Sequence, residues 1–195
     1  MMSNILIVGV GGQGSLLASR ILGAFYAKRG LDVKLSEVHG MSQRGGSVVT
    51  YVRAAERVDS PIISIHGADM ILSFEALEAA RYLDYLKLGG TIVTSTQEID
   101  PMPVITGAAK YPKDILSKLS DAGVHVVSLD ALALAVEAGS PKAANVVMIG
   151  AASKALGGTE EEWLAVLAEC VPQKFLEMNR KAFLLGRAAH MTESR

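Results

Sequence analysis

The chain has 195 residues, which is enough for one full hydrophobic core, and we expect a single α/β domain rather than two. Hydrophobic residues make up 50% of the chain and its net charge is -1, a balance that does not favour binding to nucleic acid or to an anionic membrane surface. The sequence shows neither a basic leader nor an uninterrupted apolar run near the roughly 18 residues of a membrane span, so we expect a cytoplasmic protein.

The first part of the chain has the order strand, glycine turn, helix. Residues 5–8 are an apolar run of strand length, and a helical pattern follows the turn and ends at Gly30. Between them the glycines fall at the G-x-G-x-x-G spacing, and the turn comprises Gly9, Gly11, Gly12, Gln13 and Gly14. A helix N-terminus beside such a turn offers N–H groups and partial positive charge to a phosphate. The alternative is a purely structural glycine corner.

A second strand is expected over residues 31–38, joined to the first by a right-handed parallel connection. Glu37 lies near its end. In a dinucleotide-binding enzyme, an acid about 20 residues beyond the turn binds a ribose hydroxyl. The alternative is an ordinary charged residue at the end of a strand.

Residues 39–46 form a polar, glycine-rich loop that we regard as a second candidate binding segment. Its candidate binding residues are Ser42, Gln43, Arg44 and Gly45. A guanidinium such as that of Arg44 can hold a phosphate or carboxylate through two parallel hydrogen bonds. The alternative is a loop in which Arg44 pairs with a neighbouring acid. Because the turn and this loop each follow a strand of the same direction, we expect them to meet at one edge of the sheet.

The remaining elements continue an alternation of strands and helices. We expect an extended segment at 47–53 that pairs with another at 62–65 as a hairpin-like insertion, which makes the mostly parallel sheet mixed. Further strands are expected at 70–74, 91–95 and 124–128, and helices at 75–88, 113–120, 131–138, 145–156, 160–169 and 172–187. The sequence thus predicts a three-layer Rossmann-like fold over 1–187, with a helical C-terminal region and a frayed tail over 188–195.

The chain lacks the usual signatures of a complete active site. It contains no Tyr-x-x-x-Lys pair for acid–base catalysis and no Gly-x-Ser-x-Gly turn for a nucleophile, and its four histidines are scattered without metal-ligand spacing. Cys170 is the only cysteine, so these residues by themselves cannot supply four thiolates to an iron–sulfur cluster. We therefore predict no catalytic residue and no metal site here. Together with the high apolar content, this indicates a subunit of a larger assembly.

Several motifs together resemble one known family, the gamma subunit or domain of 2-oxoacid:ferredoxin oxidoreductases, and most closely the beta subunit of its indolepyruvate branch. The similarity covers most of the chain. It includes the Gly9–Gly14 turn, the 42–46 loop, Ala68-Asp69 before the strand that ends at Phe74-Glu75, and Gly89-Gly90. It continues in the last helix, at Lys174, Asn179, Ala182, Phe183 and Gly186.

This resemblance implies a role in the oxidative decarboxylation of a 2-oxoacid with coenzyme A, which yields an acyl-CoA, carbon dioxide and reduced ferredoxin. Thiamine diphosphate and iron–sulfur clusters would then sit on a partner subunit, because this chain has neither a Gly-Asp-Gly motif nor enough cysteines. By the same resemblance, the turn and the 42–46 loop would face that partner or bind part of coenzyme A. Pyruvate and 2-oxoglutarate remain open as substrates, and the isolated chain is expected to self-associate or to bind its partner.

Two other functions fit parts of the sequence. A stand-alone NAD-binding oxidoreductase is supported by the glycine spacing and Glu37, but the missing acid–base pair opposes it. The other alternative hypothesis is a non-catalytic nucleotide-sensing module.

Overall fold

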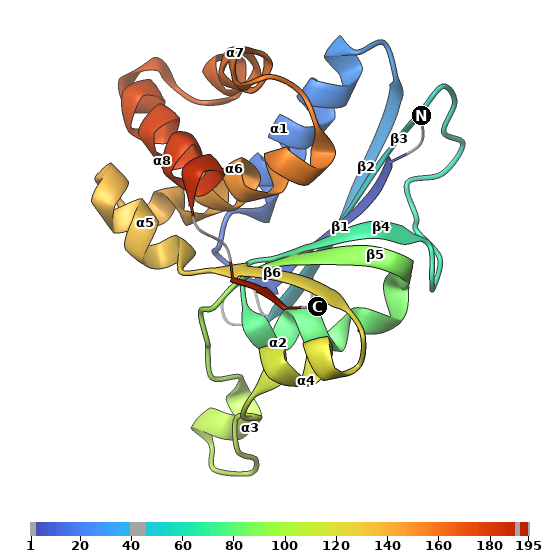
Figure 1. The fold of residues 1–195 in the computed structure, drawn as a ribbon, viewed down its shortest axis with the longest axis vertical. Coiled ribbons are helices and arrows are strands. Elements are labelled where there is room, and N and C mark those ends of the chain that lie inside the picture. The colour runs from blue at the N-terminus through green and yellow to red at the C-terminus, as the bar shows by residue number, and fades with distance from the viewer. Residues whose placement is uncertain (1–2, 40–45, 190–191, 195) are drawn as a thin grey trace.

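A computed structural model describes residues 3–39, 46–189 and 192–194 of the chain. These residues form a seven-stranded sheet in the order β2-β3-β1-β4-β5-β6-β7 (Figure 1). The strands are β1 (Ser3–Val10), β2 (Asp32–His39), β3 (Ser47–Ala55), β4 (Ala68–Ser73), β5 (Leu86–Ser95), β6 (His125–Leu129) and β7 (Thr192–Ser194). The helices are α1 (Ser15–Lys28), α2 (Ala76–Arg81), α3 (Met102–Ile105), α4 (Ile115–Asp121), α5 (Ala131–Ala138), α6 (Ala144–Leu156), α7 (Glu160–Cys170) and α8 (Leu176–Ala188), with 3-10 turns at Leu83–Tyr85, Pro141–Ala143 and Gln173–Phe175.

Helices cover both faces of the sheet. Figure 1 shows α1, α5, α6, α7 and α8 on one face and α2 and α4 on the other. Each face has its own core: Phe25, Trp163 and Phe183 lie in the larger one, whereas the smaller one packs Ile71 and Ile92 against α2 and α4. This confirms the predicted three-layer fold with a helical C-terminal region. Among the described helices, none is both long and apolar enough to cross a membrane.

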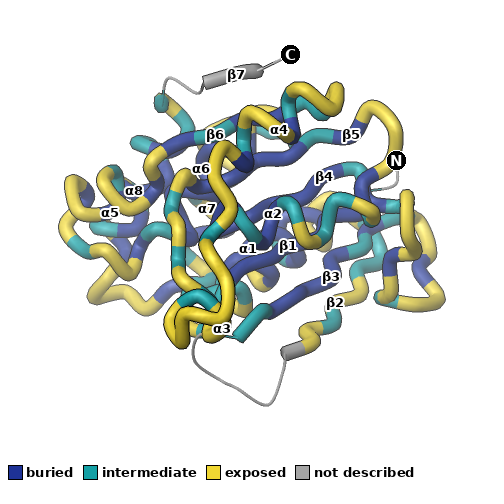
Figure 2. Tube along the Cα trace, turned by 90° about the horizontal axis from the view of Figure 1, so that it is seen from below, coloured by how far each residue is buried: buried dark blue, intermediate teal, exposed yellow. Residues whose placement is uncertain are grey.

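β1 lies at the centre of the molecule because its side chains suit burial on both faces. Ile5, Leu6, Ile7 and Val8 are fully buried, as is typical of a strand covered by helices on both sides. β1 pairs in parallel with β4 and antiparallel with β3. Figure 2 shows the central strands buried and the segment around α3 exposed. The carboxyl end of β1 therefore delivers the glycine turn to the middle of one sheet edge.

The hairpin in this sheet differs from the predicted one. β3 pairs with β2 over its whole length, from Asp32 against Ala55 to His39 against Val48, and so lies between β2 and β1. Residues 62–65 form no strand. Ile62 and Ile65 are 50% and 58% exposed, so this segment lacks the buried apolar face that a sheet strand requires. In addition, β3 already has a partner on each side. The sheet is mixed as predicted, but the antiparallel pairs are β2–β3 and β3–β1.

The predicted helix over 75–88 is shorter in the structure. α2 ends at Arg81, a 3-10 turn follows, and β5 begins at Leu86, earlier than the predicted 91. The segment that starts at Leu86 joins the sheet instead of the helix, because Leu86 is buried and pairs with Ala68 of β4. Tertiary pairing thus overrides the local helical preference.

The C-terminal tail also differs from the frayed segment that the sequence predicted. Thr192–Ser194 forms the edge strand β7, which pairs antiparallel with β6 from Ser128 to Val126. Backbone hydrogen bonds to a sheet edge can order a segment whose side chains give no strand signal.

Candidate functional site

The candidate site is a crevice at the carboxyl edge of the sheet, where the chain switches direction between layers. α1 leaves β1 toward one face, whereas α2 follows β4, the adjacent parallel strand, toward the opposite face. Crevices at such switch points are the usual ligand sites of open α/β sheets. Here the cavity has a volume of about 360 Å³. Its described lining residues are Gly12, Gln13, Gly14, Phe74, Ser95, Gln97, Ala131, Leu132, Pro141, Lys142, Ala144, Asn145 and Met148.

The glycine turn needs glycine at defined places. Gly14 caps α1 in the left-handed conformation, with φ 85° and ψ 32°, and contributes no side chain to the cap. A Cβ atom there would lie 2.4 Å from Asn145 Nδ2. Gly12 has a φ of 102°, and a Cβ atom at that position would meet nothing within 4 Å. The backbone at Gly12 is therefore open, as close approach of an anion requires, whereas Asn145 covers Gly14.

The side-chain amide of Gln13 forms its hydrogen bonds with other groups of the protein. Its Oε1 accepts a hydrogen bond from Val10 N at 2.7 Å, and its Nε2 donates to Phe74 O at 3.0 Å and to Gln97 Oε1 at 3.1 Å. These contacts join the turn after β1 to the ends of β4 and β5. The Gln13 side chain thus holds the turn in place, and the predicted part of Gln13 in ligand binding stays a prediction.

The N-terminus of α1 and one lysine give the crevice a positive character. α1 and α6 both begin at its wall, and the Asn145 side chain of α6 bridges them by donating to Gly14 O at 3.1 Å. α1 has no side-chain cap, whereas at the start of α6 Val146 N donates to Asn145 Oδ1 at 2.8 Å and Ala144 N donates to Pro141 O. Lys142 is the only ionisable residue among the described lining residues. Helix N-termini and a lysine both favour an anionic ligand.

The predicted loop residues Ser42, Gln43, Arg44 and Gly45 lie outside the described residues. The described end of that loop does reach the turn, since Gly11 N donates to Gly46 O at 2.9 Å. β1 and β2 run in the same direction, because both are antiparallel to β3. The segment after β2 therefore starts and ends at the edge where the glycine turn lies.

Glu37 is engaged by protein groups. Its Oε2 accepts hydrogen bonds from Ser15 Oγ at 2.9 Å and from Thr50 Oγ1 at 3.1 Å. The carboxylate thus ties β2 and β3 to the first residue of α1. This geometry matches the structural reading of Glu37 as a charged residue near a strand end.

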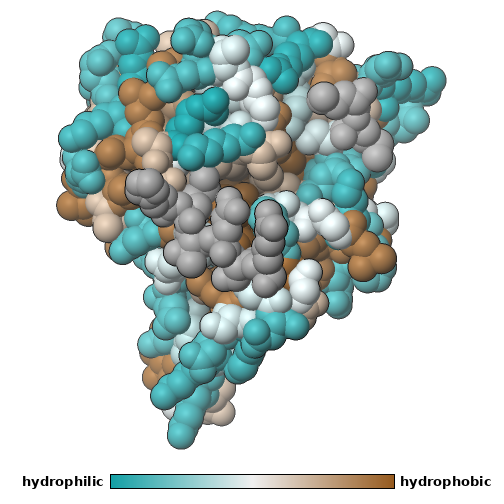
Figure 3. Space-filling view, in the orientation of Figure 1, coloured by the Kyte–Doolittle hydropathy of each residue, from teal (hydrophilic) through white to brown (hydrophobic). Residues whose placement is uncertain are grey.

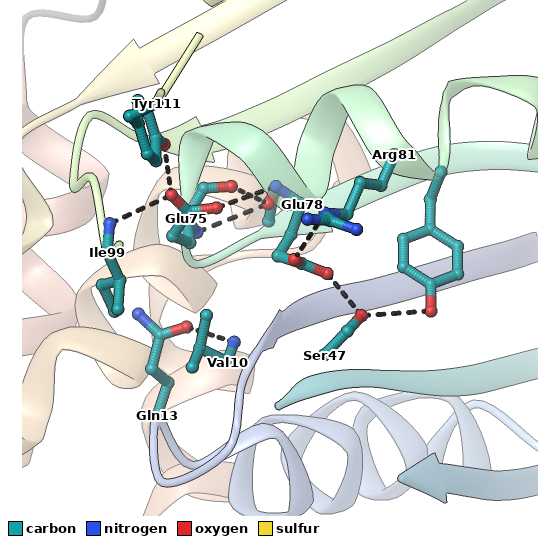
Figure 4. A network of polar contacts seen from close by, with 10 residues as sticks. Val10, Gln13, Ser47, Glu75, Glu78, Arg81, Ile99 and Tyr111 are labelled. Atoms are coloured by element: carbon teal, nitrogen blue, oxygen red, sulfur yellow. Dashed lines mark hydrogen bonds and ion pairs between the residues drawn. The ribbon is translucent and has the colours of Figure 1, made fainter. Parts of the chain in front are cut away.

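Two buried acids at the start of α2 organise the segments beside the crevice (Figure 4). Glu75, which is 1% exposed, accepts hydrogen bonds from Glu78 N at 2.8 Å, Ile99 N at 3.1 Å and the Tyr111 hydroxyl. Glu78 accepts from Ser47 Oγ and pairs with Arg81 at 3.1 Å. Burial, followed by the hydrogen bond to Glu75, raises the pKa of the Tyr111 hydroxyl above its ordinary value. Both acids are therefore engaged by protein groups beside the crevice.

The pKa of Glu78 provides a test of this network. Burial raises it above its ordinary value of 4.5, and the hydrogen bond from Ser47 and the charge of Arg81 oppose that shift only in part. The folded chain therefore binds more protons than the unfolded chain in this range, so the contribution of Glu78 to stability falls as pH rises from 4.5 through the raised pKa. We expect Glu78→Gln to flatten the pH dependence of the urea midpoint in this window. A variant with the wild-type slope would contradict the burial argument.

No group of three or more His, Cys, Asp or Glu side chains in the described parts of the chain is arranged to hold a metal ion. Cys170 is half-buried near the end of α7, and burial raises the pKa of its thiol. A raised pKa disfavours the thiolate, which is the form that acts as nucleophile or metal ligand.

Several lining residues were not predicted from the sequence. Gln97, Lys142 and Asn145 reach the crevice from elements far from the glycine turn in the chain. Gln97 had a usable signal, since it follows a predicted strand at the same sheet edge. Lys142 and Asn145 had none, because the packing of α6 against α1 brings them to the site.

The fold and the crevice together define a Rossmann-like α/β domain with a glycine turn at its switch point. The sequence matches the family described as pyruvate ferredoxin/flavodoxin oxidoreductase over residues 4–189, and the chain belongs to this family. This confirms the family resemblance seen in the sequence motifs.

A relative and two solved structures illustrate the similarity. Indolepyruvate oxidoreductase subunit IorB of Thermococcus kodakarensis is 45% identical over 188 residues, which cover 94% of this chain and 93% of that one. The gamma subunit of a keto/oxoacid ferredoxin oxidoreductase from Geobacter sulfurreducens has a similar fold, with a TM-score of 0.69, 23% identity, and coverage of 94% and 95%. The 2-oxoglutarate:ferredoxin oxidoreductase of Magnetococcus marinus gives a TM-score of 0.70 at 21% identity, covering 96% of this chain and 30% of that one.

These comparisons support neither alternative function, the stand-alone NAD-binding oxidoreductase or the nucleotide-sensing module.

Proposed function

We propose that this chain is the gamma-type subunit of a 2-oxoacid:ferredoxin oxidoreductase whose substrate is indolepyruvate. The complex would decarboxylate the 2-oxoacid, transfer the acyl group to coenzyme A and pass the electrons to ferredoxin. The observation that carries this proposal is the 45% identity to an indolepyruvate oxidoreductase subunit over nearly the full length of both chains.

The electron-carrying cofactors are assigned to a partner subunit because this chain's residues do not fit them. An iron–sulfur cluster generally requires four thiolates, and the sequence has one cysteine. It also lacks the Gly-Asp-Gly motif of thiamine diphosphate sites. Thiamine diphosphate supplies the decarboxylation chemistry when it is bound. The catalytic partner that holds these groups would be a protein of the cytoplasm, where thiols stay reduced.

The crevice is the proposed contribution of this chain to substrate binding. The uncapped N-terminus of α1 and Lys142 favour a phosphate, and coenzyme A carries several. The sequence adds Ser42, Gln43, Arg44 and Gly45 as a second phosphate-binding segment, whose end at Gly46 is bonded to the turn. A carboxylate of the partner subunit would satisfy the same donors, and this is the second candidate ligand.

Exposed apolar side chains support the role of a subunit. Leu132 and Val136 of α5 are 37% and 58% exposed, and Figure 3 shows apolar surface on the flank where Figure 1 places α5. Met102 and Ile105 of α3 are more exposed still. Obligate subunits commonly cover such surface in an interface.

Reconstitution tests the proposal. The purified chain is expected to show no turnover, and addition of the thiamine diphosphate and iron–sulfur partner should give indolepyruvate- and coenzyme A-dependent reduction of a viologen dye. Pyruvate and 2-oxoglutarate, assayed in parallel, should give a kcat/KM at least about tenfold lower if the substrate assignment is right. Turnover by this chain alone would contradict the subunit role, and equal rates on all three acids would contradict the substrate assignment.

A further inference from the structure

Residues 98–111 form an arm that leaves the carboxyl edge of β5, carries α3 and returns to α4. Figure 1 shows this arm projecting away from the three layers. None of residues 96–114 is buried, and Figure 2 shows the same segment exposed. Such a segment has few apolar contacts of its own to fix its position. Backbone hydrogen bonds such as that from Ala109 N to Pro103 O order the arm within itself, so its placement on the domain depends on its two ends.

Glu75 contacts both ends of the arm. One oxygen, Oε1, accepts from Ile99 N at 3.1 Å near the start and from the Tyr111 hydroxyl at the end, and Oε2 accepts from Glu78 N at 2.8 Å. The side chain is 1% exposed, so water does not replace these contacts. A buried carboxylate with several donors makes stronger hydrogen bonds than a neutral acceptor. Figure 4 shows Tyr111 and Ile99 converging on this carboxylate.

The start of the arm is also a wall of the crevice. Gln97 lies two residues before Ile99, lines the cavity and accepts a hydrogen bond at its backbone oxygen from Ala76 N at 3.0 Å. Its side-chain Oε1 accepts from Gln13 Nε2 at 3.1 Å. A continuous series of hydrogen bonds therefore runs from the start of α2 through Gln97 to the glycine turn.

We propose that Glu75 is a positioning residue: by holding both ends of the arm, it fixes Gln97 and, through Gln13, the glycine turn that faces the ligand. Its effect on catalysis rests on the proposed function, whereas its effect on the turn does not. Glu75 itself touches no ligand. Ordering the crevice before binding lowers the cost of binding, so loss of Glu75 should weaken ligand affinity more than the chemical step.

The first measurement is hydrogen exchange in the purified full chain. Glu75→Gln keeps the size of the side chain. Its amide N–H₂, however, faces one of the groups that donate a hydrogen bond to the carboxylate in the wild-type chain. We expect faster exchange in peptides that contain Ile99 and in peptides that contain Gln13. Tyr111→Phe, which removes one contact and leaves the carboxylate intact, should give a smaller change at both places. If the arm exchanges faster while the turn does not change, or if neither changes, the proposal is overturned.

The second measurement is steady-state kinetics of the reconstituted complex. Glu75→Gln should raise the KM for coenzyme A about tenfold with kcat changed by less than about twofold, and Tyr111→Phe should raise KM about threefold. Asn4→Ala is the matched control, since Asn4 is buried and bonded to Gly67 and Arg53 at the opposite edge of the sheet. It should lower the melting temperature without changing KM.

The outcomes separate this inference from the proposed function. An equal rise in KM in Asn4→Ala would show a general stability effect and overturn the positioning role. If Glu75→Gln does not fold, Tyr111→Phe decides by both measurements. If the wild-type complex shows no coenzyme A-dependent turnover, the proposed function fails, and the exchange comparison still decides whether Glu75 positions the turn.

Discussion

Gly150→Ala is expected to destabilise the fold by about 3 kcal/mol or more, at the upper end of the cost of overpacking a core. Gly150 lies in α6, where α8 packs against it so closely that a Cβ atom would lie 2.1 Å from Phe183 O and 3.0 Å from Arg187 N. Both atoms belong to the backbone of α8, so no side-chain rotation relieves the contact. Urea unfolding with an unchanged m-value measures the effect as a shift of the midpoint.

Gly23→Ala is the matched control for this variant. Gly23 is a buried glycine in α1, but the nearest atom to its Cβ would be Leu35 Cδ1 at 3.2 Å, the end of a flexible side chain. Alanine also gains up to about 1 kcal/mol of helix propensity over glycine. The net change should therefore stay within about 1 kcal/mol. Equal midpoints for the two variants would contradict the close approach of α6 and α8.

Gly14→Ala is expected to lower kcat/KM for coenzyme A in the reconstituted complex by about a hundredfold, since a misplacement of about 1 Å can cost that much. Alanine is strained at the φ of 85°, and its Cβ would lie 2.4 Å from Asn145 Nδ2. Relief of that contact requires the Asn145 side chain to move and to give up its hydrogen bond to Gly14 O, which joins the start of α6 to the start of α1 beside the crevice.

Two further variants separate the effect of backbone strain in Gly14→Ala from the effect of its Cβ contact with Asn145. Gly30→Ala imposes similar strain at a φ of 77°, where a Cβ atom would meet nothing within 4 Å, at the other end of α1. It should reduce stability without changing the KM for coenzyme A. Combining Gly14→Ala with Asn145→Ala removes the clash and should restore part of the activity. A Gly14→Ala complex with wild-type kcat/KM would show that the turn is not part of the binding site.

The elements that were predicted well are those with strong local signals. The run from Ile5 to Val8, the glycine turn and α1 follow one another directly, so their hydrophobic pattern and glycine spacing suffice to predict them. The helices of the C-terminal region are similarly bounded by glycine and proline, and α6 was predicted to within one residue at its start.

The differences arise where pairing between distant segments decides the structure. β3 was expected to pair with residues 62–65, but it pairs with β2 and β1, because strand pairing depends on which edges are free and on which faces the helices cover. Residues 86–88, which were predicted to end the helix that starts at residue 75, belong to β5 for the same reason. β7 pairs through backbone groups, which leave little trace in the side-chain sequence.

The sequence by itself determined the family, the three-layer fold and the position of the glycine turn at the end of the first strand, because each depends on motifs within short segments. Only the tertiary structure decided how the crevice is built. Lys142 and Asn145 reach it through the packing of α6, and the amide of Gln13 turns inward to hold Gln97. Glycine spacing identifies a turn that can bind an anion, but it contains no information about which distant side chains will complete the site, since those are set by long-range packing.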